Sequence, residues 1–312
     1  MSLLKCISLS NGALVAPPRE SVICLGNFDG VHLAHQALLK KALEIRQKHF
    51  PRASCAVLCF SSLSSDHLLA SPPAHLSTLE QKRRLFAEMG MEYLFLAEFD
   101  QLRSLTPEDF ILRILQEQCH CVAAVCGFNY RFGKNGSGNA DTLRQLLGAP
   151  VTVLDEILAD GSCVSSTKIR NLLAIGKVDV AAKLLTRPYS FEAEVVHGKS
   201  LGRAIGVPTL NQFFPPKVLI PCHGVYITDC EVDCDVYRGV SNVGVHPTVD
   251  DAACVNCETH LLDVSQDLYG KLVKVSFLSY LRPECRFDSI EALQKQLQTD
   301  IEAARSYQKE AL

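Results

Sequence analysis

The chain has 312 residues, of which 47% are apolar and 21% are charged, and its formal net charge is -3. This length suffices for two globular domains, and no run of basic residues forms the stripe that a nucleic-acid partner requires. No apolar run approaches the ~20 residues of a membrane span, and the first residues lack a signal-peptide core followed by a cleavage site, so we expect a cytoplasmic protein with no membrane partner.

The first half of the chain alternates short apolar runs with helical patterns. Thr106 and Pro107 open one such helix, and Thr78 with Gln81 forms a capping box for another, which ends at Gly90. The apolar runs predict strands at 21–25, 55–60, 93–99, 121–128 and 151–155. This alternation predicts a parallel sheet covered by helices, with ligands bound beyond the carboxyl ends of the strands.

The second half changes character after about Leu185. Short strands separated by Gly, Pro, Asp and Asn are predicted at 190–196, 224–232, 236–243, 258–264 and 271–278. They indicate an antiparallel barrel or sandwich, and a closing helix is expected after an Asp288 cap. The tight joint at 186–188 divides the chain into domains 1–185 and 186–312. The sequence leaves the oligomeric state open.

Fourteen cysteines are scattered mainly through apolar runs, which is typical of buried thiols in a reducing compartment. A four-thiolate zinc site is the alternative for the paired cysteines Cys230, Cys234, Cys254 and Cys257. Reduced thiols are the favoured interpretation, because such paired spacings are common by chance.

The stretch GNFDGVHLAHQALL at 26–39 places His32 and His35 one helical turn apart where a loop becomes a helix. The pair has three interpretations: metal ligands, ordinary polar helix residues, or contacts for a phosphate. Two ligands are too few for a structural zinc site, whereas a helix N-terminus already attracts anions. Phosphate recognition is therefore favoured.

Three ordered motifs carry a resemblance. GNFDGVHLAHQALL resembles the nucleotide-binding loop of HxGH nucleotidyltransferases, and with GFNYRFGKNGSGNADTLRQL at 127–146 and VSSTKIRNLLAIGKV at 164–178 it resembles the N-terminal module of bacterial bifunctional riboflavin kinase/FAD synthetases. The resemblance implies a Rossmann-like domain that transfers AMP from ATP to FMN, forming FAD and pyrophosphate. It assigns Gly26, Asn27 and Phe28 to the nucleotide and His32 and His35 to its phosphates.

The other two motifs receive roles by the same resemblance. Residues that hold the leaving pyrophosphate would be Ser165, Ser166, Thr167 and Arg170, and residues that border the flavin would be Asn129, Phe128, Tyr130 and their neighbour Phe132. Taken alone, the first group is more often a helix cap. The second group is equally well a strand end buried by aromatic side chains.

Two features depart from the family pattern. Ala34 stands where the signature has glycine, and LCFSSLSSDH at 58–67 replaces a turn that commonly contains Asp and Pro. They leave open a second hypothesis, in which the chain is a riboflavin kinase with a degenerate N-terminal nucleotide-binding domain.

The segment HGKSLGRAIGVPTLN at 197–211 matches the GRxxGxPTxN signature of riboflavin kinases without a substitution. Read locally, its glycines are equally well ordinary turns between strands. The resemblance implies a six-stranded antiparallel β-barrel kinase domain with a terminal helix. It assigns Mg²⁺ to Thr209 and Asn211, and ATP to Gly198, Gly202, Arg203, Gly206 and Pro208.

Glu258 matches the catalytic base of this family, although an isolated glutamate is usually only solvated. Arg282 and the terminal helix are expected to help close the flavin pocket. Together the motifs predict a bifunctional enzyme that converts riboflavin to FMN and FMN to FAD with ATP and Mg²⁺. A non-catalytic flavin-binding or nucleic-acid-binding protein on the same barrel is the alternative from another class, although the missing basic patch argues against nucleic acid.

Overall fold

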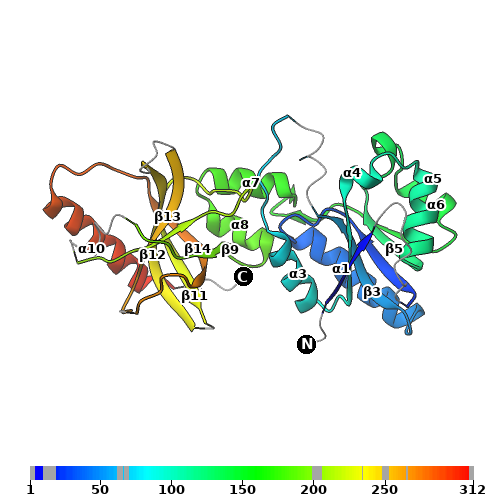
Figure 1. Ribbon diagram of the computed structural model, residues 1–312, viewed down its shortest axis with the longest axis horizontal. Coiled ribbons are helices and arrows are strands. Elements are labelled where there is room, and N and C mark those ends of the chain that lie inside the picture. Colours follow the sequence, from blue (N-terminus) through cyan, green and yellow to red (C-terminus); the bar gives the residue numbers. More distant parts are fainter. Residues whose placement is uncertain are drawn as a thin grey trace. The chain divides into compact units, whose positions relative to one another are not determined.

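The computed structural model describes residues 4–9, 19–61, 66, 70–198, 206–233, 235–247, 253–264 and 266–308. The chain forms two compact units, residues 1–165 and 166–312 (Figure 1). Helices α7 (Ser166–Ala174) and α8 (Val178–Leu185) thus fold with the second unit. The functional boundary at 185/186 stays a prediction.

Six parallel strands form the sheet of the first unit, in the order β1-β4-β3-β2-β5-β6. Their bounds are β1 Lys5–Leu9, β2 Ser21–Leu25, β3 Ser54–Phe60, β4 Tyr93–Ala97, β5 Cys121–Gly127 and β6 Val151–Leu154. The five predicted strands are confirmed. The sequence interpretation missed β1, which pairs with β4 at the sheet edge.

Helices cover both faces of this sheet, so alternate side chains of each strand enter different cores. Val22 and Cys24 pack with α1 (Leu33–His49) and α3 (Leu79–Glu88), and Ile23 and Leu25 pack with the opposite layer. That layer includes η1 (Phe110–Gln118), which is a π-helix, and α6 (Ala140–Leu146). The remaining elements are α4 Phe99–Leu102, α5 Pro107–Asp109, η2 Lys134–Gly136, β7 Leu158–Ala159 and β8 Ser162–Cys163.

The second unit is an antiparallel sheet in the order β10-β13-β12-β11-β14-β9. The strands are β9 Tyr189–Glu194, β10 Leu210–Phe213, β11 Gly224–Val232, β12 Asp235–Pro247, β13 Ala253–Leu261 and β14 Leu272–Arg282. Its two outer strands meet through a bridge between Val196 and Asn211. The Gln212 side chain supports this closure by donating Nε2 hydrogen bonds to Ala193 O (2.7 Å) and Val273 O (2.9 Å). The predicted barrel is confirmed.

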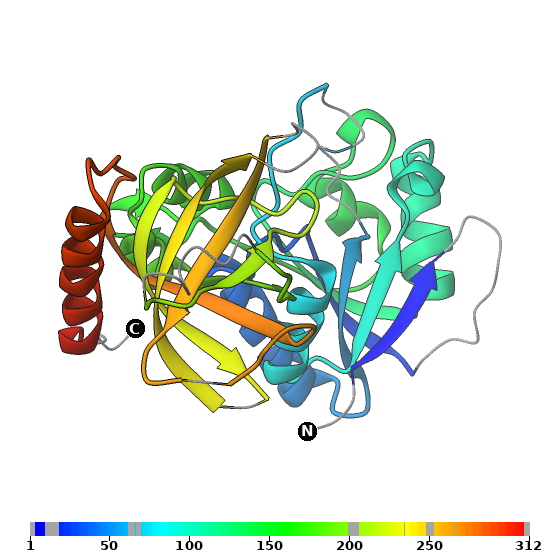
Figure 2. The ribbon, with the colours of Figure 1, turned by 60° about the vertical axis from the view of Figure 1, so that its left-hand side comes forward.

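The terminal helix α10 (Ile290–Ser306) packs on β11 and β12, on the outside of the barrel (Figure 2). Its cap differs from the prediction: Ser289, not Asp288, is the N-cap residue, and its hydroxyl accepts a hydrogen bond from Ala292 N at 3.1 Å. Both residue types are good caps, and the backbone conformation one residue later decided between them.

Cys230 and Cys257 are fully buried within the barrel, and burial raises the pKa of the Cys257 thiol to about 12. Cys234 and the Cys254 side chain lie outside the described residues. In the described part of the chain, no three or more His, Cys, Asp and Glu side chains gather to hold a metal, and no helix is long and apolar enough to cross a membrane.

Candidate functional sites

The first candidate site lies at the carboxyl ends of β2 and β5, which are neighbours in the sheet. From β2 the chain adds β3 and β4 on one side, and then returns to add β5 and β6 on the other. Such a reversal leaves a crevice beyond the strand ends, where ligands of open α/β sheets bind. The loops after Leu25 and Cys126, which are paired in register, both reach this edge.

The loop after β2 has an unusual backbone. Phe28, Gly30 and Val31 all have positive φ angles, of 51°, 81° and 42°. This conformation costs free energy at Phe28 and Val31, because residues with a Cβ rarely adopt a positive φ and β-branched residues do so least of all. Both side chains are fully buried, so packing holds the strained loop in place.

Three polar contacts fasten the same loop to α3 and to the segment that leads into this helix. The Asp29 carboxylate accepts a hydrogen bond from Leu76 N at 3.0 Å, and Gly30 N donates to Ser77 Oγ at 3.0 Å. Lys82 Nζ donates to Asn27 O at 3.1 Å.

The sequence interpretation missed the residues that make these contacts. A signal existed for Lys82, which stands at an apolar-face position of the predicted helix, four residues before Phe86. Asp29 and Ser77 carried no such signal, because only the fold brings their contacts together.

His32 is the N-cap residue of α1, and its ring stacks on that of His35 with centroids 3.7 Å apart. Burial, the neighbouring His32 and then Lys82 together hold the pKa of His35 well below its ordinary value. His35 is therefore neutral near pH 7 and offers a hydrogen bond to an anion without a full charge. Ala34 lies between them in the first turn, half-buried.

The loop after β5 divides into an exposed and a buried part. Phe128 is 53% exposed and Asn129 is exposed, whereas Phe132 is buried and packs on Phe110 with centroids 5.3 Å apart. Tyr130 stacks on Phe132, and burial raises the pKa of its hydroxyl. Phe128 and Asn129 are thus the members of the predicted flavin set that a ligand can reach directly.

The residues predicted to hold pyrophosphate span the boundary between the two units along the chain. Ser165 is the last residue of the first unit, and α7 begins at Ser166. Helix α7 is attached to the second unit, where Cys222 N donates a hydrogen bond to Leu173 O at 2.9 Å. Thr167 is exposed, and Arg170 is half-buried.

The second candidate site lies on the outer face of the barrel. Glu258 on β13 pairs with Asn211 on β10 and with Asn242 on β12, so these three side chains share one face. The flanking residues Cys257 and Thr259 are fully buried and point into the barrel. Glu258 thus stands directly beside Asn211, although 46 residues lie between them in the sequence.

Asn211 is held by its neighbours. Its Oδ1 accepts a hydrogen bond from Asn256 Nδ2 at 3.2 Å, and its amide lies directly over Gly198, where a Cβ would be 2.3 Å from Nδ2. Pro208 O lies 2.8 Å from His260 Nδ1, which fixes the segment that carries Thr209. Gly202 and Arg203 lie outside the described residues, and Gly206 is exposed with a φ of 82°.

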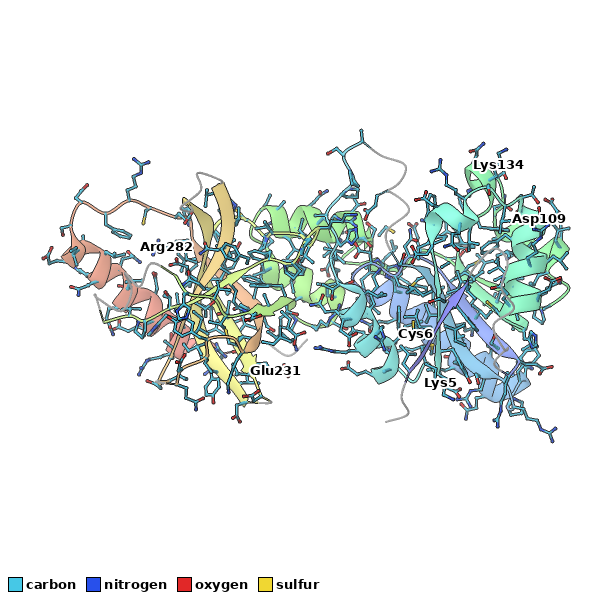
Figure 3. The ribbon with its side chains drawn as sticks, in the orientation of Figure 1. Lys5, Cys6, Asp109, Lys134, Glu231 and Arg282 are labelled. Carbon is cyan, nitrogen blue, oxygen red and sulfur yellow. The ribbon has the colours of Figure 1, made fainter. Side chains whose placement is uncertain are left out.

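Glu284, which the sequence interpretation missed, adds a second carboxylate to this face. Its Oε1 accepts a hydrogen bond from Asn242 Nδ2 at 2.9 Å, and it lies so close to Gly244 that no Cβ would fit there. The neighbouring Arg282 binds Asp300 on α10 through Nη2 (2.8 Å) and Nε (3.1 Å), and ties β14 to that helix (Figure 3). Arg282 thus holds the segment that carries Glu284.

Comparison with known proteins gives matches over both units. A riboflavin kinase family model matches residues 185–308, and an FAD synthetase model matches residues 15–168. Proteins named bifunctional riboflavin kinase/FMN adenylyltransferase are 35% identical in Pseudomonas fluorescens (92% of this chain, 93% of the relative) and 33% identical in Listeria monocytogenes (92% of each). A solved structure described as a macrolide-efflux protein of Streptococcus pneumoniae is 30% identical, with a TM-score of 0.88 over 98% of this chain and 100% of that one.

Proposed function

Because the chain belongs to the bifunctional riboflavin kinase/FMN adenylyltransferase family, we propose that it makes FMN from riboflavin and then FAD from FMN, using ATP in both steps. We assign adenylyl transfer to residues 1–185 and phosphorylation to residues 186–312. The many free thiols among the described cysteines support a reducing, cytoplasmic location.

The observation that carries the kinase assignment is the direct pairing of Asn211 with Glu258. Phosphorylation of a primary alcohol needs a carboxylate that takes the hydroxyl proton and oxygen ligands that position the phosphates. The 5′-hydroxyl oxygen of riboflavin attacks the γ-phosphorus, its proton passes to Glu258, and the bond from the γ-phosphorus to the β-phosphate oxygen breaks to release ADP.

Thr209 and Asn211 offer hard oxygen donors, which fit Mg²⁺. The Asn211 amide is already oriented by Asn256 and Gly198, so its oxygen is held in place before any ligand arrives. Bound there, the cation would neutralise the β- and γ-phosphate charge. Gly198, Gly202, Arg203, Gly206 and Pro208 form the proposed cover over ATP.

The adenylyltransferase assignment is supported by the strained loop and stacked histidines at the reversal point of the sheet. A phosphate oxygen of FMN attacks the α-phosphorus of ATP, and the bond from that phosphorus to the β-phosphate breaks to expel pyrophosphate. His32 and His35 donate hydrogen bonds to the charge that develops there. Ser165, Ser166, Thr167 and Arg170 are proposed to hold pyrophosphate, and Phe128, Asn129 and Tyr130 to border the flavin.

The test is a product assay on the purified full chain with riboflavin, ATP and Mg²⁺, in which flavins are separated chromatographically. We expect FMN followed by FAD. FMN without FAD would leave the kinase with a degenerate first domain, and flavin binding with neither product would leave a binding protein.

Glu258→Gln tests the base. Removing a positioned general base typically lowers a rate by about 10²- to 10⁴-fold, so FMN formation should fall by this factor. FAD formation from added FMN is the internal control and should be unchanged. Full kinase activity in Glu258→Gln would rule out the assigned role.

A further inference from the structure

Lys82 occupies a core position of α3, beneath the loop that follows β2. Its side chain is only 4% exposed. It lies in the same helical row as Phe86, whose ring packs edge-on against Phe28 with centroids 5.5 Å apart. An apolar residue would ordinarily occupy such a position, so the ammonium group calls for an explanation.

The charge of Lys82 has no anionic partner in the described part of the chain. Its Nζ donates one hydrogen bond, to Asn27 O at 3.1 Å, and no carboxylate of the described residues lies within ion-pair distance. A charge removed from water is costly unless an opposite charge accompanies it. A buried ammonium group of this kind is therefore suited to contact an anion.

The hydrogen bond also sets the shape of the loop. Because the Asn27 carbonyl points inward to Lys82 while its side chain is exposed, the bond fixes which way this peptide unit faces. Asp29 and Gly30 are fastened two and three residues further on, so the three contacts together hold the strained segment. Lys82 supplies the only one of these contacts that carries a positive charge.

We propose that Lys82 is a positioning residue for adenylyl transfer, which holds the Asn27 peptide and lends a buried positive charge to the triphosphate of ATP. This inference rests on the adenylyltransferase function proposed above. The proposed anion is the nucleotide polyphosphate, because its negative charge would pair with the buried ammonium group of Lys82.

The charge also acts on the stacked histidines. His32 in the loop and Lys82 in α3 are the positively charged or titratable groups that lower the pKa of His35, in addition to its burial, and the Asp29 carboxylate is the acidic group of the same loop. Removal of the Lys82 charge should therefore raise the pKa of His35. The acidic limb of the pH profile for FAD formation would then move to higher pH.

The experiment uses the full chain with Lys82→Met, which keeps the length of the side chain and removes its charge. We expect kcat/KM for ATP in FAD formation to fall by about 100-fold, as for loss of one preorganised electrostatic contact, with a raised KM for ATP and a shifted acidic limb. FMN formation by the same molecule should be unchanged. The matched control is Lys41→Met, which removes an exposed lysine of α1 that forms an ion pair with Glu44.

The outcomes separate this inference from the proposed function. If the wild type forms no FAD, the proposed function of the first unit fails. If the wild type forms FAD and Lys82→Met matches it in KM for ATP and in pH profile, the role of Lys82 is refuted. Equal losses of FMN and FAD formation would make Lys82 a purely structural residue, and would also refute it.

Discussion

At the scale of single residues, Gly198 and Gly244 leave room for polar side chains of the second site because glycine has no Cβ. A Cβ on Gly198 would meet the Asn211 amide, and a Cβ on Gly244 would meet the Glu284 carboxylate. Both glycines allow a polar side chain to lie flat against the backbone at the outer face of the barrel. The Asn211 and Glu284 side chains near Glu258 therefore depend on the space that these two glycines leave.

Gly198→Ala should displace Asn211 while leaving Glu258 in place. A displacement of about 1 Å in a positioning group can cost about 100-fold, so we expect a 10- to 100-fold loss of kcat/KM for ATP in FMN formation. Steady-state kinetics with riboflavin in excess measures this loss. Wild-type kinetics would show that Asn211 does not position ATP.

At the scale of elements, α10 is attached to the barrel by two ion pairs of different burial. The Arg282 and Asp300 side chains are 19% and 4% exposed, whereas those of Arg305 and Asp263 are 56% and 74% exposed. Asp300 also accepts a hydrogen bond from Gln296 at 3.0 Å. The buried pair should dominate, because solvent weakens the exposed one.

Asp300→Ala should leave the Arg282 charge buried without its partner and destabilise the second unit by roughly 3 kcal/mol. Asp263→Ala is the matched control and should cost less than about 1 kcal/mol. Urea denaturation of the full chain, followed by the loss of kinase activity, compares the two variants. Equal midpoints would contradict the role given to the buried pair.

At the scale of the whole molecule, the second unit begins before the kinase motifs do. Helix α8 packs against β9 and β14, and it buries Val178, Ala181, Ala182, Leu184 and Leu185. Helix α7 precedes it and is joined to the barrel through the Leu173 carbonyl. These two helices are therefore part of the folded barrel unit, although the motif in α7 is assigned to adenylyl transfer.

A fragment of residues 166–312 should therefore be more stable than a fragment of residues 186–312. Each fully buried Leu or Val contributes about 1.5–3 kcal/mol, so loss of α8 should cost at least about 3 kcal/mol. Thermal unfolding of the two fragments measures the difference. Identical melting temperatures would show that α8 adds nothing to the barrel.

The sequence by itself determined the class of each unit and most of its strands. Apolar runs such as SVICL are buried on both faces, and the Thr78 and Gln81 capping box forms as predicted. The motif residues could be named in advance because ligand loops follow strand ends and helix starts, which local patterns mark. The short edge strands β1 and β10 escaped detection, because their pairing depends on neighbours distant in the chain.

The tertiary structure alone decided which side chains meet. Glu258 stands beside Asn211 because of strand register, and Lys82 lies under Asn27 because α3 packs on the same face of the sheet as α1. Local sequence patterns do not predict such contacts between residues that are distant in the chain. The burial that lowers the pKa of His35 is likewise a property of the assembled fold, and so is the burial of the Lys82 ammonium group.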